Sequence, residues 1–385
     1  MVALTPAIGS APATSSANFI SGSEMTDHAA HAVCDLFGIE VPVVQAPMLG
    51  FVTPAMVIGV AEAGGLGSFS LVASSPEEAR ATFAEIRRGT SRPVNVNFFC
   101  HQPPEMNAAG VAAWMSRLEP YYAELGLDCP EPRPMPPIPA FGDIQCGLVE
   151  ELKPEVVSFH FGLPAPDLLD RVRRTGAKVM SSATTVEEAM WLEESGCDAV
   201  IAQGVEAGGH RGMFLHTDID TQVGTMALVP QVVDAVKVPV IAAGGISDPR
   251  GVAAAFALGA SGVQAGSAYL LCDEANTSSL YRTALQRVCD HQTAITRIFT
   301  GRPARAIANR LVRELGPMEN DAPCFPLAAG LVSPLRAASE ALGASEFSPL
   351  WCGQAASLAR EGPAAKLTAW LASGCPSNRG AATNA

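Results

Sequence analysis

The stretch DAVIAQGVEAGGHRG, residues 198–212, passes from an apolar run into a glycine-rich segment that carries one histidine. The first five residues form a short run that is apolar after Asp198, which is typical of a strand buried on both faces of a parallel sheet. Gly208 and Gly209 let backbone N–H groups approach a ligand, because glycine has no Cβ. His210 follows, and histidine exchanges protons readily near neutral pH. A glycine-rich turn with a solvated histidine is the alternative. The residues at the other strand ends distinguish between these two interpretations.

An alternation of strand-like and helix-like segments extends in both directions from this stretch. Strands are expected at residues 42–46, 66–70, 93–97, 155–159, 178–181, 199–202, 239–243 and 262–265. Helical patterns lie between them, at residues 54–63, 76–88, 166–175, 185–195, 225–235 and 249–258. This order predicts a (β/α)8 TIM barrel. An open doubly wound sheet is less well supported, because no strand leads into G-x-G-x-x-G with an acidic residue about 20 positions later.

Several regions depart from the alternation. Residues 1–24 are rich in Ala, Ser, Pro and Thr, and we expect a disordered tail there. The barrel should span residues 25–275, with an insertion after the third strand at about 101–153, whose proline-rich stretch cannot be helical. Residues 276–372 are expected to form helices packed beside the barrel, at 280–290, 303–315, 334–342 and 349–370. Residues 373–385 should be a loose tail.

Composition narrows the class of protein. Apolar residues make up 48% of the chain and charged residues 16%, which allows a large core. A net charge of −13 argues against a nucleic-acid partner. No window has the roughly 18 apolar residues of a membrane span. The ten cysteines are scattered, without a C-x-x-C pair and without a secretory signal, which favours reduced thiols in the cytoplasm. We expect a soluble monomer or homodimer.

Active sites of TIM barrels lie at the C-terminal ends of the strands, so the residues that follow each strand define the candidate site. After the seventh strand come Gly244 and Gly245, and after the eighth come Gly266 and Ser267. Loops in these two positions commonly bind phosphate on backbone N–H groups, next to a helix N-terminus. Tight turns between strand and helix are the structural alternative. Two such turns in the expected order favour phosphate.

Other strand ends suit a flat heterocycle. Asn97, Ser182 and Gln203 carry amides and a hydroxyl that can pair with the carbonyl and N–H edge of a flavin. The turn Ala46-Pro47-Met48 offers a small, rigid, apolar surface on which a ring can lie. For Asn97 alone, a role in a cap or turn is an equally good interpretation.

Two histidines are candidates for catalysis. His210 stands in the glycine-rich loop, and His160 also projects from a strand end, where a hydrogen-bonded core histidine is the alternative. No metal site is predicted, because neither has carboxylates at ligand spacing and no H-E-x-x-H motif exists. Nucleophilic hydrolysis is disfavoured by the lack of a G-x-S-x-G elbow.

Taken in order, these motifs resemble the nitronate monooxygenases, formerly called 2-nitropropane dioxygenases, and in particular their first class. The similarity runs from about Val41 to Asn309, and QAPM and AAGGI are common to many flavin barrels. SFHFGLP with EAGGHRG and the following HTDIDTQVGT is much more specific. The residues that carry it are QAPM (45–48), NFF (97–99), SFHFGLP (158–164), QGVEAGGHRG (203–212), HTDIDTQVGTMALVPQV (216–232), AAGGI (242–246), QAGSAYL (264–270) and GRPAR (301–305).

The resemblance implies an FMN-dependent enzyme that oxidises alkyl nitronates with O2 to a carbonyl compound and nitrite. His210 matches the catalytic histidine of the family and His160 a second active-site histidine. The family usually places tyrosines and a lysine from the C-terminal region near the substrate, whereas residues 322–351 contain neither. The residues that would hold FMN are Ala46, Pro47, Met48, Asn97, Ser182, Gln203, Gly208, Gly209, Gly244, Gly245, Gly266 and Ser267.

The chemistry of these residues fits that activity. A nitronate is an anion, which His210, the adjacent Arg211 and converging N–H dipoles would attract. A neutral His210 could instead remove the α-proton of a nitroalkane. The flavin would supply the redox chemistry.

Two other functions stay open on sequence alone. The first is an NAD(P)H-dependent flavin reductase acting on a quinone or an enoyl thioester, although a separate dinucleotide fingerprint is missing. The second is a flavin-free phosphate-binding barrel, either a lyase or isomerase or a non-catalytic binding protein. Such enzymes often use a Schiff-base lysine, and the strand ends here are poor in lysine.

Overall fold

The computed structural model describes residues 32–103, 107–128 and 138–376, and an eight-stranded parallel sheet lies at its centre. The strands follow the order β1-β9-β8-β6-β5-β4-β3-β2, and a bridge between Val44 and Leu66 brings the first strand back to the second. The predicted TIM barrel is therefore confirmed. Its strands are β1 Val43–Gln45, β2 Gly67–Ser70, β3 Val94–Phe99, β4 Val156–His160, β5 Lys178–Ala183, β6 Ala199–Gln203, β8 Val240–Ala243 and β9 Gly262–Ala265.

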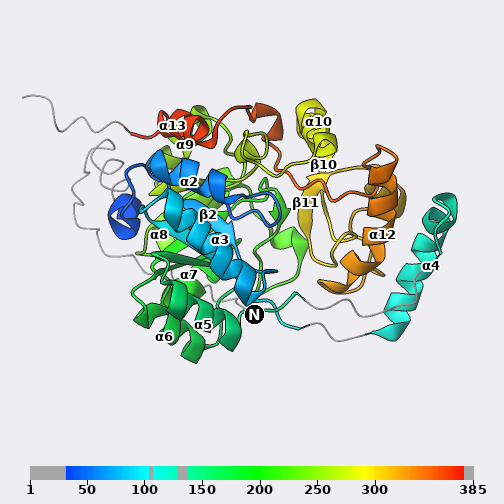
Figure 1. Cartoon of the computed structure of the whole chain (residues 1–385), viewed down its shortest axis with the longest axis horizontal. Helices are drawn as coiled ribbons and strands as arrows, with labels where there is room; N and C mark the ends of the chain where they lie inside the picture. Colours follow the sequence, from blue (N-terminus) through cyan, green and yellow to red (C-terminus); the bar gives the residue numbers. More distant parts are fainter. Residues whose placement is uncertain (1–31, 104–106, 129–137, 377–385) are drawn as a thin grey trace, which may run out of the picture.

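Helices surround this sheet (Figure 1). Several begin with a side-chain cap followed by proline, as at Thr53, Ser75 and Asp248, where the cap satisfies backbone N–H groups that the first turn leaves free. The helices predicted between strands are all present, with α5 added from the insertion. They are α2 Pro54–Glu62, α3 Pro76–Gly89, α5 Asp143–Leu152, α6 Pro166–Arg174, α7 Val186–Glu194, α8 Thr225–Ala235 and α9 Pro249–Ala257.

The C-terminal helix α13, Ala364–Ala372, packs against α2 and α9 and covers the sheet beside β1. It thus completes the ring of helices around the barrel. The predicted helix at 349–370 is wrong as a single element, because the chain forms only the short η4, Ala356–Leu358, before Gly362 and Pro363. Gly362 has a φ of 126°, which ends any helix there.

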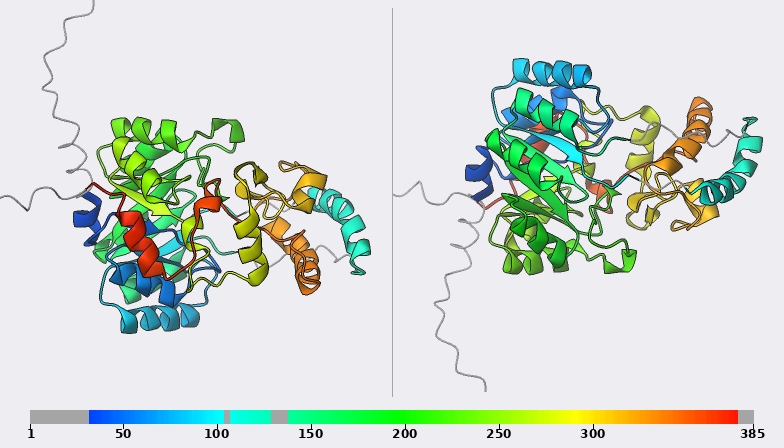
Figure 2. Two further views of the ribbon diagram at one scale, coloured as in Figure 1. Left: turned by 90° about the horizontal axis from the view of Figure 1, so that it is seen from above. Right: turned by 90° about the horizontal axis from the view of Figure 1, so that it is seen from below.

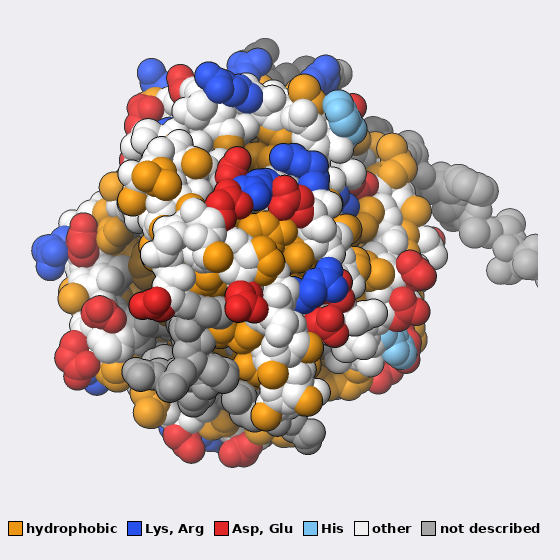
Figure 3. Space-filling view, turned by 90° about the vertical axis from the view of Figure 1, so that its right-hand side faces the viewer, with side chains coloured by type: hydrophobic (Ala, Val, Ile, Leu, Met, Phe, Trp, Pro, Cys, Tyr) orange, Lys and Arg blue, Asp and Glu red, His pale blue; other side chains and the backbone are white. Residues whose placement is uncertain are grey.

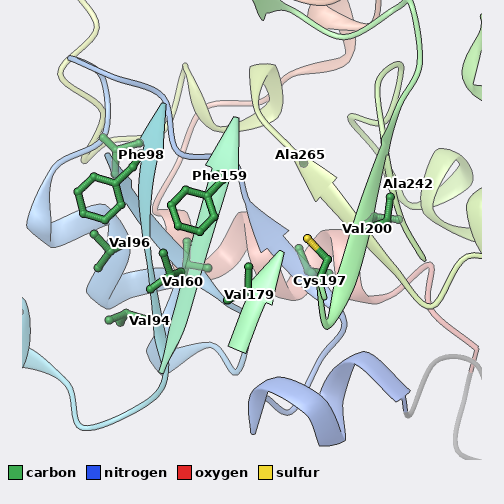
Figure 4. Packing of buried hydrophobic residues seen from close by; sticks show 14 of the residues in the cluster. Val60, Val94, Val96, Phe98, Phe159, Val179, Cys197, Val200, Ala242 and Ala265 are labelled. Carbon is green, nitrogen blue, oxygen red and sulfur yellow. The ribbon is translucent and has the colours of Figure 1, made fainter. Parts of the chain in front are cut away.

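The alternation of side chains along the strands separates the core from the site. Figure 4 shows Val94, Val96 and Phe98 on one side of β3, where they join the buried layer between sheet and helices. Since successive side chains of a strand point to opposite faces, Asn95 and Asn97 turn into the barrel. A second buried cluster, which includes Val33, Phe37 and Ile39, packs with Val44 and other inward-facing strand residues.

A second lobe stands beside the barrel (Figure 2). It contains α4 Ala108–Glu124, α10 Ser279–Arg287, α11 Arg310–Leu315 and α12 Leu327–Ala341. Trp114 and Tyr122 of α4 share a buried cluster with Leu331 and Leu335 of α12. The insertion after the third strand therefore sends α4 to the C-terminal region. The proline-rich stretch and most of the two predicted tails lie outside the described residues.

On the outer face of this lobe, acidic, basic and hydrophobic side chains are interspersed (Figure 3). Arg117 lies 2.9 Å from Glu319, and Arg310 of α11 lies 2.7 Å from Glu124 of α4. These ion pairs join the insertion to the C-terminal region at the surface. Exposed pairs of this kind each contribute little, so the buried cluster is the main stabilising contact between α4 and the C-terminal region.

The C-terminal region is not purely helical, which corrects the expectation from sequence. Strands β10, Thr293–Thr296, and β11, Ala304–Ile307, form an antiparallel sheet with the short strand β7, Gly209–His210. The predicted helix at 303–315 is wrong in its first half, because pairing with β10 and β7 overrides local propensity. The helix predicted at 334–342 begins earlier than expected, at Leu327, and contains Pro334 in its interior.

Close packing of α2 on β2 depends on Gly67, and this generates a prediction about stability. A Cβ at Gly67 would lie 2.4 Å from the carbonyl oxygen of Val57, so Gly67→Ala should lower the free energy of unfolding by about 1–3 kcal/mol. Gly147, in α5, has no atom within 4 Å of its virtual Cβ, and Gly147→Ala should raise stability by about 0.5–1 kcal/mol. Urea unfolding midpoints measure both effects. Equal shifts for the two variants would contradict this packing.

Candidate active site

One cavity of about 340 Å³ opens at the C-terminal ends of the barrel strands. Every residue predicted for the site lines it, including both histidines and the turn 46–48. The structure thus brings together residues that the sequence separates by more than two hundred positions. Residues outside the prediction also line the cavity, and these are Leu49, Phe51, Phe99, Gln264, Leu270, Thr300, Phe325, Pro326, Ala329, Trp351, Gly353 and Ala355, among others.

The glycine turns after β8 and β9 form one end of the cavity. Gly244 and Gly245 have φ values of 111° and 70°, a left-handed conformation that side chains with a Cβ rarely adopt. Asp248 caps α9 by accepting from the N–H groups of Arg250 and Gly251. The turn therefore places backbone N–H groups that no side chain covers, and a helix N-terminus, beside the cavity. This arrangement suits a phosphate dianion.

The C-terminal segment around residue 353 closes this end of the cavity. The Gly353 N–H donates to the Ser267 hydroxyl at 2.8 Å. A Cβ on Gly208 would lie 2.4 Å from the Gly353 nitrogen, so only glycine at position 208 permits this contact. The two glycines predicted as a ligand cradle therefore have different surroundings, because Gly209 has open space around its virtual Cβ. The sequence carries no short-range signal for this contact.

Gln203 holds the loop that carries His210. Its side-chain oxygen accepts from the Gly212 N–H at 2.7 Å, and its amide nitrogen donates to the His210 carbonyl at 3.1 Å. Both ends of this amide are therefore occupied by the protein. Gln264 on β9 was not predicted, and its side-chain oxygen is buried without a partner among the described residues. An unpaired buried acceptor costs free energy, so Gln264 is a better candidate for contact with a ligand.

His160 is fixed by hydrogen bonds on both ring nitrogens. Its Nε2 lies 3.2 Å from the His210 carbonyl oxygen, and its Nδ1 lies 3.1 Å from the Ser182 hydroxyl. A carbonyl can only accept, so Nε2 carries the proton and Nδ1 accepts from Ser182. Burial and the charge of Arg302 lower the pKa of His160 to about 3, which keeps it neutral. His160 thus acts on the position of His210.

His210 lies between aromatic rings and one hydroxyl. Its Nε2 is 3.0 Å from the Thr300 hydroxyl, and its ring centroid is 5.3 Å from Phe325 and 5.4 Å from Trp351. Burial, followed by the effects of His160 and Arg302, lowers its pKa to about 3. A neutral imidazole has one unprotonated nitrogen, which is what a base requires.

The backbone of His210 is held by the sheet of the second lobe. Gly209 and His210 pair with Arg305 and Ala304 of β11, and the next N–H, of Arg211, donates to the Pro303 carbonyl at 2.9 Å. The sequence predicts a loop at this histidine, because a two-residue strand whose partner lies far along the chain leaves no periodic pattern.

Arg211 lies behind the cavity wall rather than in the cavity. Its side chain is fully buried and donates to the carbonyls of Gln203 and Gly204 and to Gln222, and it is not among the residues that line the cavity. Direct contact with a ligand in the cavity is therefore not seen for Arg211, because the guanidinium satisfies backbone carbonyls at the end of β6. Its charge still helps to lower the pKa of His160, so its attraction for a nitronate stays a prediction.

Arg302 is a cation that acts on both histidines. Its guanidinium carbon lies 3.8 Å from the centroid of the Phe161 ring, one nitrogen donates to the Met213 carbonyl, and its charge lowers the pKa of both His160 and His210. The sequence did contain a signal, because Arg302 belongs to the GRPAR segment, but no strand end pointed to it.

Metal binding and membrane insertion receive no support from the described residues. Within 32–103, 107–128 and 138–376, no three His, Cys, Asp or Glu side chains are arranged to hold a metal ion. In the same ranges, no helix has the length and apolar character needed to cross a membrane. The described cysteines are all free.

Known proteins resemble this chain along most of its length. A nitronate monooxygenase from Pseudomonas aeruginosa is 43% identical over 342 residues, which cover 86% of this chain and 95% of that protein. A nitronate monooxygenase from Paraburkholderia phytofirmans is 40% identical over 359 residues, with 90% and 96% covered.

Solved structures agree in fold. A nitroalkane oxidase from Streptomyces ansochromogenes has a TM-score of 0.80 at 38% identity and covers 89% of this chain and 97% of its own. FabK from Thermotoga maritima has a TM-score of 0.68 at 30% identity, with 89% and 94% covered. The sequence pattern of the nitronate monooxygenases matches residues 30–374. This chain is therefore an enzyme of the nitronate monooxygenase family.

Proposed function

We propose that this enzyme binds FMN in the cavity at the barrel mouth and oxidises alkyl nitronates with O2 to a carbonyl compound and nitrite. The observation that carries the proposal is the meeting of two glycine turns and His210 in one cavity of a nitronate monooxygenase family member. The free cysteines support our placing this reaction in the cytoplasm.

The residues of the cavity fit FMN. The left-handed turn at Gly244 and Gly245 would hold the phosphate on backbone N–H groups, together with Gly266 and Ser267. The unpaired oxygen of Gln264 offers an acceptor for an N–H of the ring system. The turn 46–48 supplies an apolar surface at the same cavity. When bound, FMN supplies the capacity to accept electrons from the substrate and to pass them to oxygen.

The protein's own residues bind the substrate and handle the proton. A nitronate is already ionised, so it needs no base, and the charge of Arg302 reaches the region of His160 and His210 where it would lie. A nitroalkane must first lose its α-proton, and His210 is the neutral imidazole placed to take it. Because its pKa is lowered to about 3, His210 is a weak base, and nitronates should react faster than nitroalkanes.

The first test is spectroscopic and catalytic. The purified enzyme should be yellow and release FMN on denaturation, and a nitronate with air should give nitrite. His210→Asn should keep FMN and nitronate oxidation while losing most activity on neutral nitroalkanes, by a factor of about 100 or more. His216→Asn is the matched control, because His216 is exposed, pairs with Glu187 and lies outside the cavity lining.

Two results would contradict this proposal. Turnover of nitroalkanes by His210→Asn at the original rate would remove the base assignment. Rapid anaerobic bleaching of the flavin by NADH or NADPH, with none by a nitronate, would favour the second candidate function, an NAD(P)H-dependent reductase. The FabK structure resembles this chain in fold, which is why both reductants belong in the same experiment.

Thr300 provides a second prediction, because its hydroxyl is the hydrogen-bond partner of Nε2 of His210. Thr300→Val keeps the shape and removes the hydroxyl, so the imidazole loses its fixed orientation. We expect kcat/KM for a nitroalkane to fall about tenfold, the equivalent of about 1.4 kcal/mol. The value for the matching nitronate should change far less, and Thr300→Ser should restore the nitroalkane activity. An equal loss for both substrates, or no rescue by serine, would mean that Thr300 acts only on the fold.

A further inference from the structure

We infer that Thr225, the first residue of α8, is a positioning residue for the phosphate end of the cavity. Its hydroxyl holds the carbonyl of Gly244, and this orientation turns the N–H of Gly245 toward the place proposed for the phosphate. The inference rests on the proposed function and extends FMN binding to a residue behind the cavity wall. It also gives a role to the segment 216–232, which carries part of the family resemblance although none of its residues, all described, lines the cavity.

The peptide between Gly244 and Gly245 needs an anchor, because two successive glycines restrict its orientation very little. The Thr225 Oγ1 lies 3.0 Å from the Gly244 carbonyl oxygen and donates to it. This peptide bond is trans, so the N–H of Gly245 points away from that carbonyl and from Thr225. Gly245 lines the cavity and Thr225 does not. The anchor therefore directs to the cavity side an N–H that has no hydrogen-bond partner among the described residues.

The neighbouring positions leave room for the Thr225 hydroxyl only because they are glycines. A Cβ on Gly204 would lie 1.9 Å from the Thr225 Oγ1, and a Cβ on Gly244 would lie 2.9 Å from it. Any side chain at position 204 would therefore displace the hydroxyl from its place beside the turn. Gly204 belongs to the segment after β6 and Gly244 to the segment after β8, so the fit of Thr225 explains a glycine at the end of each strand.

Glu206 fixes Thr225 at the start of α8. The N-cap of this helix is Gly224, which has no side chain to accept from the first turn, and the Glu206 carboxylate does so instead. Its two oxygens accept from the Thr225 N–H at 3.0 and 2.9 Å, and one of them lies 2.8 Å from the Thr225 hydroxyl. The hydroxyl proton is thus shared between this carboxylate and the Gly244 carbonyl, as in a three-centre hydrogen bond.

The loop that carries Glu206 is itself held by two buried arginines. Arg305 donates from Nε to the Val205 carbonyl at 2.9 Å, and Arg211 donates to the Gly204 carbonyl at 2.7 Å. Burial lowers the pKa of both guanidiniums, and the charge of Glu206 acts in the opposite direction. The negative charge of Glu206 near the phosphate end is therefore balanced by cations behind the cavity wall.

The test measures which flavin the enzyme retains. FMN and riboflavin differ only in the phosphate, so the ratio of their affinities reports on the phosphate end of the cavity. The enzyme is equilibrated with a mixture of the two, and the bound flavins are separated by chromatography and quantified. We expect the original enzyme to prefer FMN by a factor of about 100 or more. Thr225→Ala should reduce this preference by a factor of about 10 or more, and Thr225→Ser should keep it within about twofold.

Thr185→Ala is the matched control. Thr185 also places a hydroxyl at the start of a barrel helix, where it accepts from the Glu188 N–H, and it does not line the cavity. Its loss should lower stability without changing the flavin ratio. Thr225→Cys keeps a side chain of similar size with a weaker donor and should give a ratio between those of serine and alanine. Equal ratios for Thr225→Ser and Thr225→Cys would overturn the inference even if Thr225→Ala did not fold.

The flavin ratio separates this inference from the proposed function. If the original enzyme binds riboflavin as tightly as FMN, the phosphate adds nothing, and the proposed FMN site fails together with the inference. If the original enzyme prefers FMN and Thr225→Ala keeps the same preference, only the inference fails. A purely structural role for Thr225 would weaken both flavins by the same factor and leave the ratio unchanged, which is also a failure of the inference. A lower ratio with unchanged riboflavin affinity is the result that the inference requires.

Discussion

Backbone pairing between residues 209–210 and residues 304–305 joins the loop that carries His210 to the small sheet of the second lobe. The same strand, β11, bridges Trp351 on the segment that closes the cavity. A TIM barrel alone would leave the loop after β6 to be fixed only by its own turns. Here a single strand from outside the barrel sets the position of the candidate base and of one ring that faces it, so the second lobe is part of the site.

This arrangement accounts for the electrostatics of the site. His160, Gln203 and Thr300 take up hydrogen bonds on and around His210, and burial among Phe325 and its neighbours keeps the imidazole neutral. Arg302 lies two residues after Thr300 in the chain, so the connection between β10 and β11 supplies both a hydrogen-bond partner and a cation. A neutral imidazole and an apolar wall therefore meet at one place in the cavity, with the charge of Arg302 close by.

Sequence reasoning predicted the barrel and the cavity better than the second lobe. Strands such as β6 and β8 are short apolar runs at regular spacing, and the rule that sites lie at strand ends gathered residues as distant as Met48 and Ser267. The β7–β11 pairing joins residues about a hundred positions apart and gives no local pattern, so β11 was predicted as helix. Arg211 was predicted from its position beside His210, but only the structure shows that the side chain of a neighbour points elsewhere.

We propose that one mononucleotide lies between the glycine turns and His210. A crystal structure of the enzyme with bound FMN measures this directly. We expect the phosphate within hydrogen-bonding distance of the backbone nitrogens of Gly244 and Gly245, with the ring system extending toward the imidazole of His210. A phosphate bound elsewhere, or a ring system separated from His210 by the wall of the barrel, would contradict it.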